Sequence, residues 1–208
     1  MERKFELMED EFVTIEGKKL YRIIAIKDFG KVKAGALGGY VESESNLSQE
    51  DNCWIADEAK VFNGARVEGN ATLIEEASVS GDVVVTEDVF IEGDAIVNNT
   101  TGKCITLGGR LHLAAGALIE SPDNFVTIMT HDGTISLFKN DNNGIDICLY
   151  HGEEFIHTDV AEFFNKYSEK GMLSFSAILV LGAICNIDQP YYSHKFVYFH
   201  SNILIFQH

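Results

Sequence analysis

Residues 53–100 divide into eight hexads: CWIADE, AKVFNG, ARVEGN, ATLIEE, ASVSGD, VVVTED, VFIEGD and AIVNNT. The first residue of each is small or aliphatic: Cys53, Ala59, Ala65, Ala71, Ala77, Val83, Val89 and Ala95. The third is a branched aliphatic residue: Ile55, Val61, Val67, Leu73, Val79, Val85, Ile91 and Val97. The last two are mostly turn formers or acids. This pattern predicts one short strand and one turn per hexad.

The alternation within each hexad predicts which side chains are buried. Positions one and three of an extended strand point to one side, and position two points to the other. Gly, Asn and Asp tolerate the left-handed backbone that the turns at positions five and six need. Three hexads close one triangular coil of 18 residues, so residues 47–100 supply three coils with a packed interior. A helix would need a period of 3.6 residues, which this region lacks.

The flanking sequence extends the solenoid at both ends. We expect a mainly β protein with a left-handed β-helix of four to five coils over residues 37–119. Residues 107–118 repeat the spacing in a shifted frame after a break at residues 101–106. Residues 1–36 predict a β-hairpin that covers the open first coil, because an uncovered solenoid end exposes strand edges.

Residues 120–208 predict a separate C-terminal α+β domain. Its strands are expected over residues 125–129, 135–138 and 145–150, and residues 196–206 are expected to form an edge strand or an oligomer contact. A helix is expected over residues 158–170, where Thr158 would cap the first turn, and residues 172–185 are expected to form a second, buried helix, with a strand as the alternative.

Charge and cysteine content restrict the classes of function. The net charge is −16, and residues 42–100 hold 14 acidic and two basic side chains. Such a surface repels nucleic acid and attracts a partner with a basic surface. The four cysteines form no CxxC pair, which leaves a zinc site or a disulfide framework unsupported and favours the reducing cytoplasm. The longest uncharged apolar run, residues 172–187, is too short to span a bilayer.

The acidic residues are predicted to stack in columns, because residues 18 apart lie in adjacent coils. One corner of the triangle receives Asp57, Glu58, Glu75, Glu76 and Asp94, a second receives Asp51, Glu87 and Asp88, and the third receives Asp82. Stacked like charges cost stability, and Asn-Gly turns serve the fold equally well. We therefore interpret these carboxylates as partner-binding residues that imitate a nucleic-acid backbone, with calcium binding and solubility as alternative roles.

A second feature is a ribbon of outward apolar residues formed by Trp54, Ile74 and Phe90. A solvated face does not normally carry Trp and Phe in register. The ribbon is predicted to contact a partner, or to receive the C-terminal domain or a second copy of the chain.

The segment that leads into the repeats resembles a known group of proteins. Its motif, LGGYVE…NLSQ…NCW over residues 37–54, is similar to that of phage and prophage accessory proteins with left-handed β-helices. The stretch FVTIMTHDGTISL…LYHGEEF…AEFF resembles their small α+β domain. The resemblance covers residues 1–187. It implies the fold and a phage context and leaves the activity open.

The sequence contains no strong catalytic or metal-binding motif. His151, Glu153, Glu154 and His157 match no metal-ligand spacing. All seven histidines follow the three regular coils, and His112, at an outward position two, is interpreted as a solvated surface residue. No catalytic residue, metal or cofactor is therefore assigned.

We predict a non-enzymatic inhibitor of a host nucleic-acid-handling or defence protein, of the anti-CRISPR kind, acting in the bacterial cytoplasm. Two alternatives remain. One is a phage structural or assembly module that oligomerises through its C-terminal region. The other is a hexapeptide-repeat acyltransferase, in which a histidine acts as general base.

Overall fold

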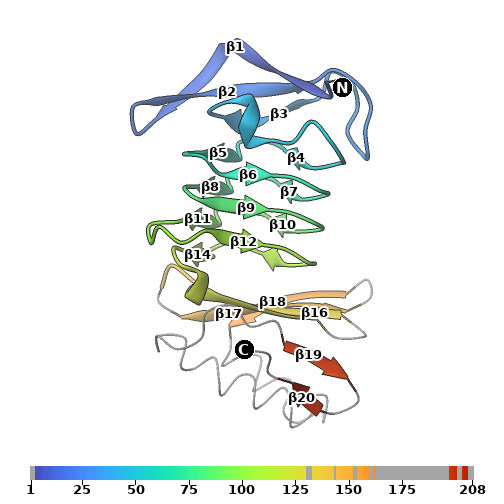
Figure 1. Ribbon diagram of the computed structural model, residues 1–208, viewed down its shortest axis with the longest axis vertical. Helices are drawn as coiled ribbons and strands as arrows, with labels where there is room; N and C mark the ends of the chain where they lie inside the picture. Colours follow the sequence, from blue (N-terminus) through green and yellow to red (C-terminus); the bar gives the residue numbers. More distant parts are fainter. Residues whose placement is uncertain are drawn as a thin grey trace.

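The computed structural model describes residues 3–129, 133–142, 144–151, 154–159, 162, 197–200 and 203–205. These residues form a mainly β structure with a solenoid of about four turns at its centre. Figure 1 shows an N-terminal hairpin above the stacked coils and a second sheet below them. In the described residues, helix is limited to two short 3-10 turns, Glu44–Asn46 and Pro122–Asn124, and to Glu162.

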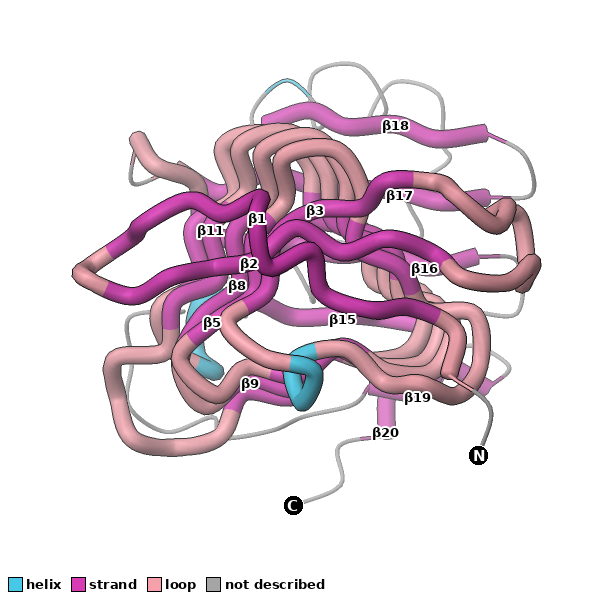
Figure 2. The backbone as a smooth tube through the Cα atoms, turned by 90° about the horizontal axis from the view of Figure 1, so that it is seen from above, coloured by secondary structure: helices cyan, strands magenta, loops and turns pink. Residues whose placement is uncertain are grey.

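The solenoid is built from strands of two or three residues, stacked in parallel in three columns (Figure 1). The first column contains β4 (Trp54–Ile55), β7 (Thr72–Leu73), β10 (Phe90–Ile91) and β13 (His112–Leu113). The second contains β6 (Arg66–Val67), β9 (Val83–Val85) and β12 (Ile105–Leu107). The third contains β5 (Lys60–Phe62), β8 (Ser78–Ser80), β11 (Ile96–Asn98) and β14 (Leu118–Ile119). Figure 2 shows the coils lying one behind another.

The interior consists of the residues at hexad positions one and three. All sixteen side chains at these positions between Cys53 and Val97 are at most 1% exposed. The predicted hexad phase is therefore confirmed throughout the regular coils. Packed branched side chains fill the triangle, as expected when all strands turn the same alternate residues inward.

Coil length changes once, at the predicted break. Trp54 pairs with Thr72 and Thr72 with Phe90, 18 residues apart, whereas Phe90 pairs with His112, 22 residues apart. The four additional residues lie in the loop between β11 and β12. The repeat resumes at Ile105, which is buried and pairs with Val83, so the frame predicted to start at residue 107 is wrong.

A hairpin closes the upper end of the solenoid, in agreement with the prediction. Strand β1 (Phe5–Ile15) pairs with β2 (Lys18–Ala25), and β2 pairs with β3 (Leu37–Val41), which continues in parallel onto β5. Lys4 is only 1% exposed, and its Nζ donates to the carbonyl oxygens of Glu50 at 2.8 Å and Cys53 at 3.0 Å. The ammonium group thus satisfies carbonyls of the first coil.

Two glycines in β3 permit the hairpin to approach this coil closely. A Cβ atom on Gly38 would lie 2.5 Å from Ile23 Cγ1 and 2.6 Å from the carbonyl oxygen of Ile55. A Cβ on Gly39 would lie 2.7 Å from Ile55 Cγ2. The Gly-Gly pair of the LGGYVE motif is therefore explained by close backbone packing.

A six-stranded sheet covers the lower end (Figure 1). Its strands are β15 (Phe125–Met129), β16 (Gly133–Lys139), β17 (Ile145–His151), β18 (Glu154–Asp159), β19 (Val197–His200) and β20 (Ile203–Ile205). Phe138 and Cys148 are at most 1% exposed and join the solenoid core, so the sheet closes the open last coil.

The predicted C-terminal α+β domain is not supported. Thr158, predicted to cap a helix, lies in strand β18. Nearly all of the helix predicted over residues 158–170 and the whole of that over residues 172–185 lie outside the described residues. The strands predicted over residues 125–150 are confirmed as a meander. Within the described residues, no helix has the length and apolar character required to cross a bilayer.

Candidate functional site

The predicted acidic columns exist, and the structure gives several of their members a role in the fold. An Asp57 Oδ2 oxygen accepts a hydrogen bond from the Glu75 amide at 3.1 Å. Glu75 Oε2 accepts from the Gly93 amide at 2.9 Å, and Asp94 Oδ1 from the Gly116 amide at 2.7 Å. Each carboxylate therefore binds the turn of the next coil. The assumption that the fold has no use for these acids is wrong.

The backbone explains why carboxylates stand at these turns. Asp51, Asp57, Glu75 and Glu87 have φ between 51° and 58°, in the left-handed region. Glycine is the usual residue there, and the hydrogen bonds that the Asp57 and Glu75 carboxylates accept from backbone amides compensate part of the cost. Glu87 contacts the Gly109 amide in the same way.

The other predicted partner-binding acids differ from one another in the contacts they make. Glu58 Oε1 accepts from Arg22 Nη2 at 2.7 Å, which ties the hairpin to the first coil. Asp88 Oδ1 accepts from Asn70 Nδ2 at 3.1 Å. A partner-binding role for these residues, and for Glu76 and Asp82, stays a prediction, as do the basic partner and oligomerisation.

The apolar ribbon is not a continuous exposed surface. Trp54 is only 6% exposed, because the ring of Phe29 packs edge-on against it at a centroid distance of 5.4 Å. Phe90 and Ile74 are partly exposed. The interpretation of Trp54 as an exposed contact residue is wrong, because the segment that connects β2 with β3 covers it.

At the other end of this column, His112 is enclosed between the solenoid and the lower sheet. Its side chain is 13% exposed. The Phe155 ring stacks on the imidazole at 4.0 Å with an interplanar angle of 16°, and the Phe90 ring approaches edge-on at 4.9 Å. His112 Nε2 lies 2.9 Å from Glu92 Oε1. The interpretation of His112 as a solvated residue is therefore wrong.

The Glu92 contact assigns the proton on the His112 ring. A carboxylate accepts hydrogen bonds, so Nε2 carries the proton and Nδ1 of the neutral imidazole holds a lone pair. Burial lowers the pKa of His112 below its ordinary value, although Glu92 acts in the opposite direction. An oriented, neutral imidazole whose second ring nitrogen holds a lone pair has the properties of a general base.

A second histidine–carboxylate pair faces this site from the lower sheet. His157 Nε2 lies 3.1 Å from Asp146 Oδ2, and Asn140 Nδ2 donates to Asp146 Oδ1 at 2.9 Å. Phe155 and His157 are two residues apart on β18, so both side chains point to the same face.

The cysteine thiols are less suited to catalysis than the His112 imidazole. Burial raises the pKa of the Cys53 and Cys148 thiols, so neither is a ready thiolate. The pKa of the exposed Cys104 is raised as well, by partial desolvation and by Asp82. Among the described residues, no group of three His, Cys, Asp or Glu side chains could hold a metal ion.

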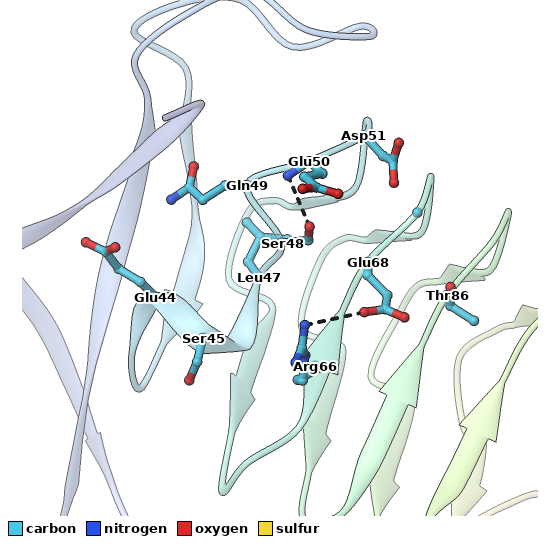
Figure 3. A pocket seen from close by; sticks show the side chains of 11 residues that line it. Glu44, Ser45, Leu47, Ser48, Gln49, Glu50, Asp51, Arg66, Glu68 and Thr86 are labelled. Carbon is cyan, nitrogen blue, oxygen red and sulfur yellow. Dashed lines mark hydrogen bonds and ion pairs between the residues drawn. The ribbon is translucent and has the colours of Figure 1, made fainter. Parts of the chain in front are cut away.

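A groove of 570 Å³ lies on the opposite part of the solenoid, beside the first coils (Figure 3). Glu44, Glu50, Asp51 and Glu68 line it together with hydroxyl groups, and Arg66 contributes the cation. Arg66 lies 3.5 Å from Glu68. The excess of carboxylates would repel a phosphate-bearing ligand.

The comparisons connect part of the chain with a named activity. The chain is similar to a protein of Escherichia coli K12 named uncharacterized acetyltransferase YdcK, with 44% identity over 73 residues. The match covers 35% of this chain and 22% of that protein, so the chain spans about a fifth of the length of the curated relative. No family model matches the chain.

This similarity overturns the predicted function. The chain was predicted to be a non-enzymatic inhibitor of a host protein, whereas the relative is named an acetyltransferase. Both the inhibitor reading and the assignment as a non-enzyme are therefore wrong, and the acyltransferase alternative is favoured. From the sequence, His112 and His157 are named separately, and Glu92, Asp146 and Phe155 are not named. An alignment of Phe90 with His112 across the four-residue insertion would have placed the histidine beside Glu92.

Proposed function

We propose that this chain contributes to an acyltransferase that moves an acetyl group from a thioester donor to a hydroxyl or amine acceptor. The observation that carries the proposal is the enclosed His112–Glu92 pair, which joins the last two coils of the first column. The similarity of part of the chain to a protein named an acetyltransferase supports it.

The geometry of the pair suggests how the proton would move. The Nε2–H group of His112 donates a hydrogen bond to Glu92, which leaves Nδ1 to take up a proton from the acceptor. This transfer occurs as the oxygen or nitrogen of the acceptor attacks the thioester carbonyl. The carbon–sulfur bond breaks, and the imidazolium returns the proton to the departing thiolate. Glu92 also stabilises the imidazolium that forms between these two events.

Thioester turnover with purified protein tests the proposal. Release of free thiol from acetyl-coenzyme A would be followed with panels of amine and hydroxyl acceptors. His112→Gln is expected to lower kcat by about 100-fold or more, because a general base contributes about 10²–10⁴-fold. Glu92→Gln is expected to cause a smaller loss, since it removes the charge but keeps a polar partner.

Thr72→Ala is the matched control, because Thr72 occupies the same outward column two coils above His112. It should leave turnover unchanged. Turnover in the wild type that survives His112→Gln would contradict the assigned base, and absence of turnover with every acceptor would contradict the proposal.

Several finer expectations accompany this proposal. We expect the solenoid to be left-handed and the chain to divide into residues 1–36, 37–119 and 120–208. The resemblance of the LGGYVE…NLSQ…NCW motif to phage accessory proteins remains a prediction about the relatives of this chain. Residence in the cytoplasm also remains a prediction.

A further inference from the structure

The imidazole of His112 stands at an outward position of the solenoid and is nevertheless covered. Thr72, the equivalent residue one coil above Phe90, is partly exposed and has no ring above it among the described contacts. His112 is covered because Phe155, from a segment far along the chain, stacks on its face at 4.0 Å. The cover therefore comes from the lower sheet and not from the repeat.

Strand β18, which carries this ring, is an edge strand among the described residues. It stands at one end of the described sheet and pairs only with β17 there. Phe155 is 38% exposed, so a large part of its ring already contacts solvent. A strand with one hydrogen-bonded neighbour and a half-exposed anchor opens at lower cost than a central strand.

The residues beside Phe155 restrain the strand by polar contacts. His157 on β18 bonds Asp146 on β17, and Asn140 holds the other oxygen of that carboxylate. These contacts keep β18 attached to its own sheet. The contact of Phe155 with His112, by contrast, joins the sheet to the solenoid.

We propose that the Phe155 ring is a movable cover of the candidate site, and that its displacement from the imidazole exposes His112 to the acceptor. This inference rests on the proposed function for the role of the exposed imidazole. The covering of His112 by Phe155 can be measured without any activity. Phe155 is in this scheme a positioning residue, since it acts through the imidazole it shields.

Chemical labelling of the full chain tests the cover. Diethyl pyrocarbonate acylates accessible neutral imidazoles, and the labelling rate of the peptide that contains His112 would be followed by mass spectrometry. Phe155→Ala is expected to raise this rate by between about twofold and tenfold, the range expected for the loss of one aromatic pair. Phe155→Leu, which keeps an apolar side chain, should give an intermediate rate and guards against misfolding of the alanine variant.

Phe12→Ala is the matched control, because Phe12 is also a half-exposed phenylalanine (44% exposed) and lies on the N-terminal hairpin. It should leave the labelling of His112 unchanged. An unaltered rate in both Phe155 variants, with a native circular dichroism spectrum, would overturn the cover.

The same variants separate this inference from the proposed function. Faster labelling in Phe155→Ala together with higher kcat/KM for acetyl transfer supports both. Faster labelling without transfer in any variant supports the cover and overturns the proposed function. Transfer that depends on His112 but is unaffected by Phe155, with unchanged labelling, overturns the cover alone.

Discussion

The middle of the solenoid and its two ends use the same repeat with different results. In the middle, the outward residue Thr72 is partly exposed and pairs with Trp54 and Phe90 of its own column. At the ends, the equivalent residues Trp54 and His112 are covered by Phe29 and Phe155, which belong to flanking segments. The repeat makes outward positions equivalent, and the segments that close the ends make them different.

The largest expected effect is a difference in unfolding free energy between a variant at a buried position of the repeat and a variant at an outward position. Leu73→Ala should lower the free energy of unfolding by about 2–5 kcal/mol, because it opens a cavity in a fully buried layer. Thr72→Ala, one residue earlier on the same strand, should change it by less than about 0.5 kcal/mol. Urea denaturation followed by circular dichroism measures both, and equal losses would contradict the assigned alternation.

A smaller effect tests whether the acidic turns stabilise the coils. Glu75→Ala removes the acceptor of the Gly93 amide and should cost about 0.5–1.5 kcal/mol. Glu76→Ala removes the adjacent acid, for which the described residues show no such bond, and should be neutral or slightly stabilising because it relieves repulsion. The urea concentrations at the unfolding midpoints of the two variants provide the measurement. An equal gain in stability in both variants would mean that these acids serve solubility or binding and do not stabilise the coils.

The smallest expected effect is the pH dependence of folding stability that His112 causes at the lower end of the solenoid. Burial lowers the pKa of His112 in the folded protein, so the unfolded chain binds a proton more readily. Folding stability from this group is complete above its unfolded pKa of about 6.5 and decreases as the pH falls below that value. Wild type should therefore lose more stability than His112→Gln between about pH 8 and about pH 5.

Thermal melts of the two proteins across this pH range provide the measurement. Glu92 and His157 both face the imidazole, and they remain in the variant, so the difference between the two curves reports His112. Parallel curves would mean that the imidazole is solvated as freely in the folded state as in the unfolded chain.

The resemblance to phage accessory proteins and the acidic charge favour an inhibitor, and that prediction is wrong. Several of the acids that produce this charge also take part in the backbone hydrogen bonding of the solenoid. Asp57, Glu75 and Asp94 bind amides of the following turns, which an isolated strand pattern does not reveal. Net charge describes solubility and association, whereas the chemistry depends on where single groups meet.

The sequence alone determined the hexad phase, the buried layers from Cys53 to Val97 and the closing hairpin, because period and alternation are local properties of the chain. It also placed a break after Thr100. Only the tertiary structure decided that the frame resumes at Ile105, that Trp54 is covered and that His112 meets Glu92 and Phe155. Those contacts join residues from different coils and from the C-terminal sheet, and packing between distant segments sets them.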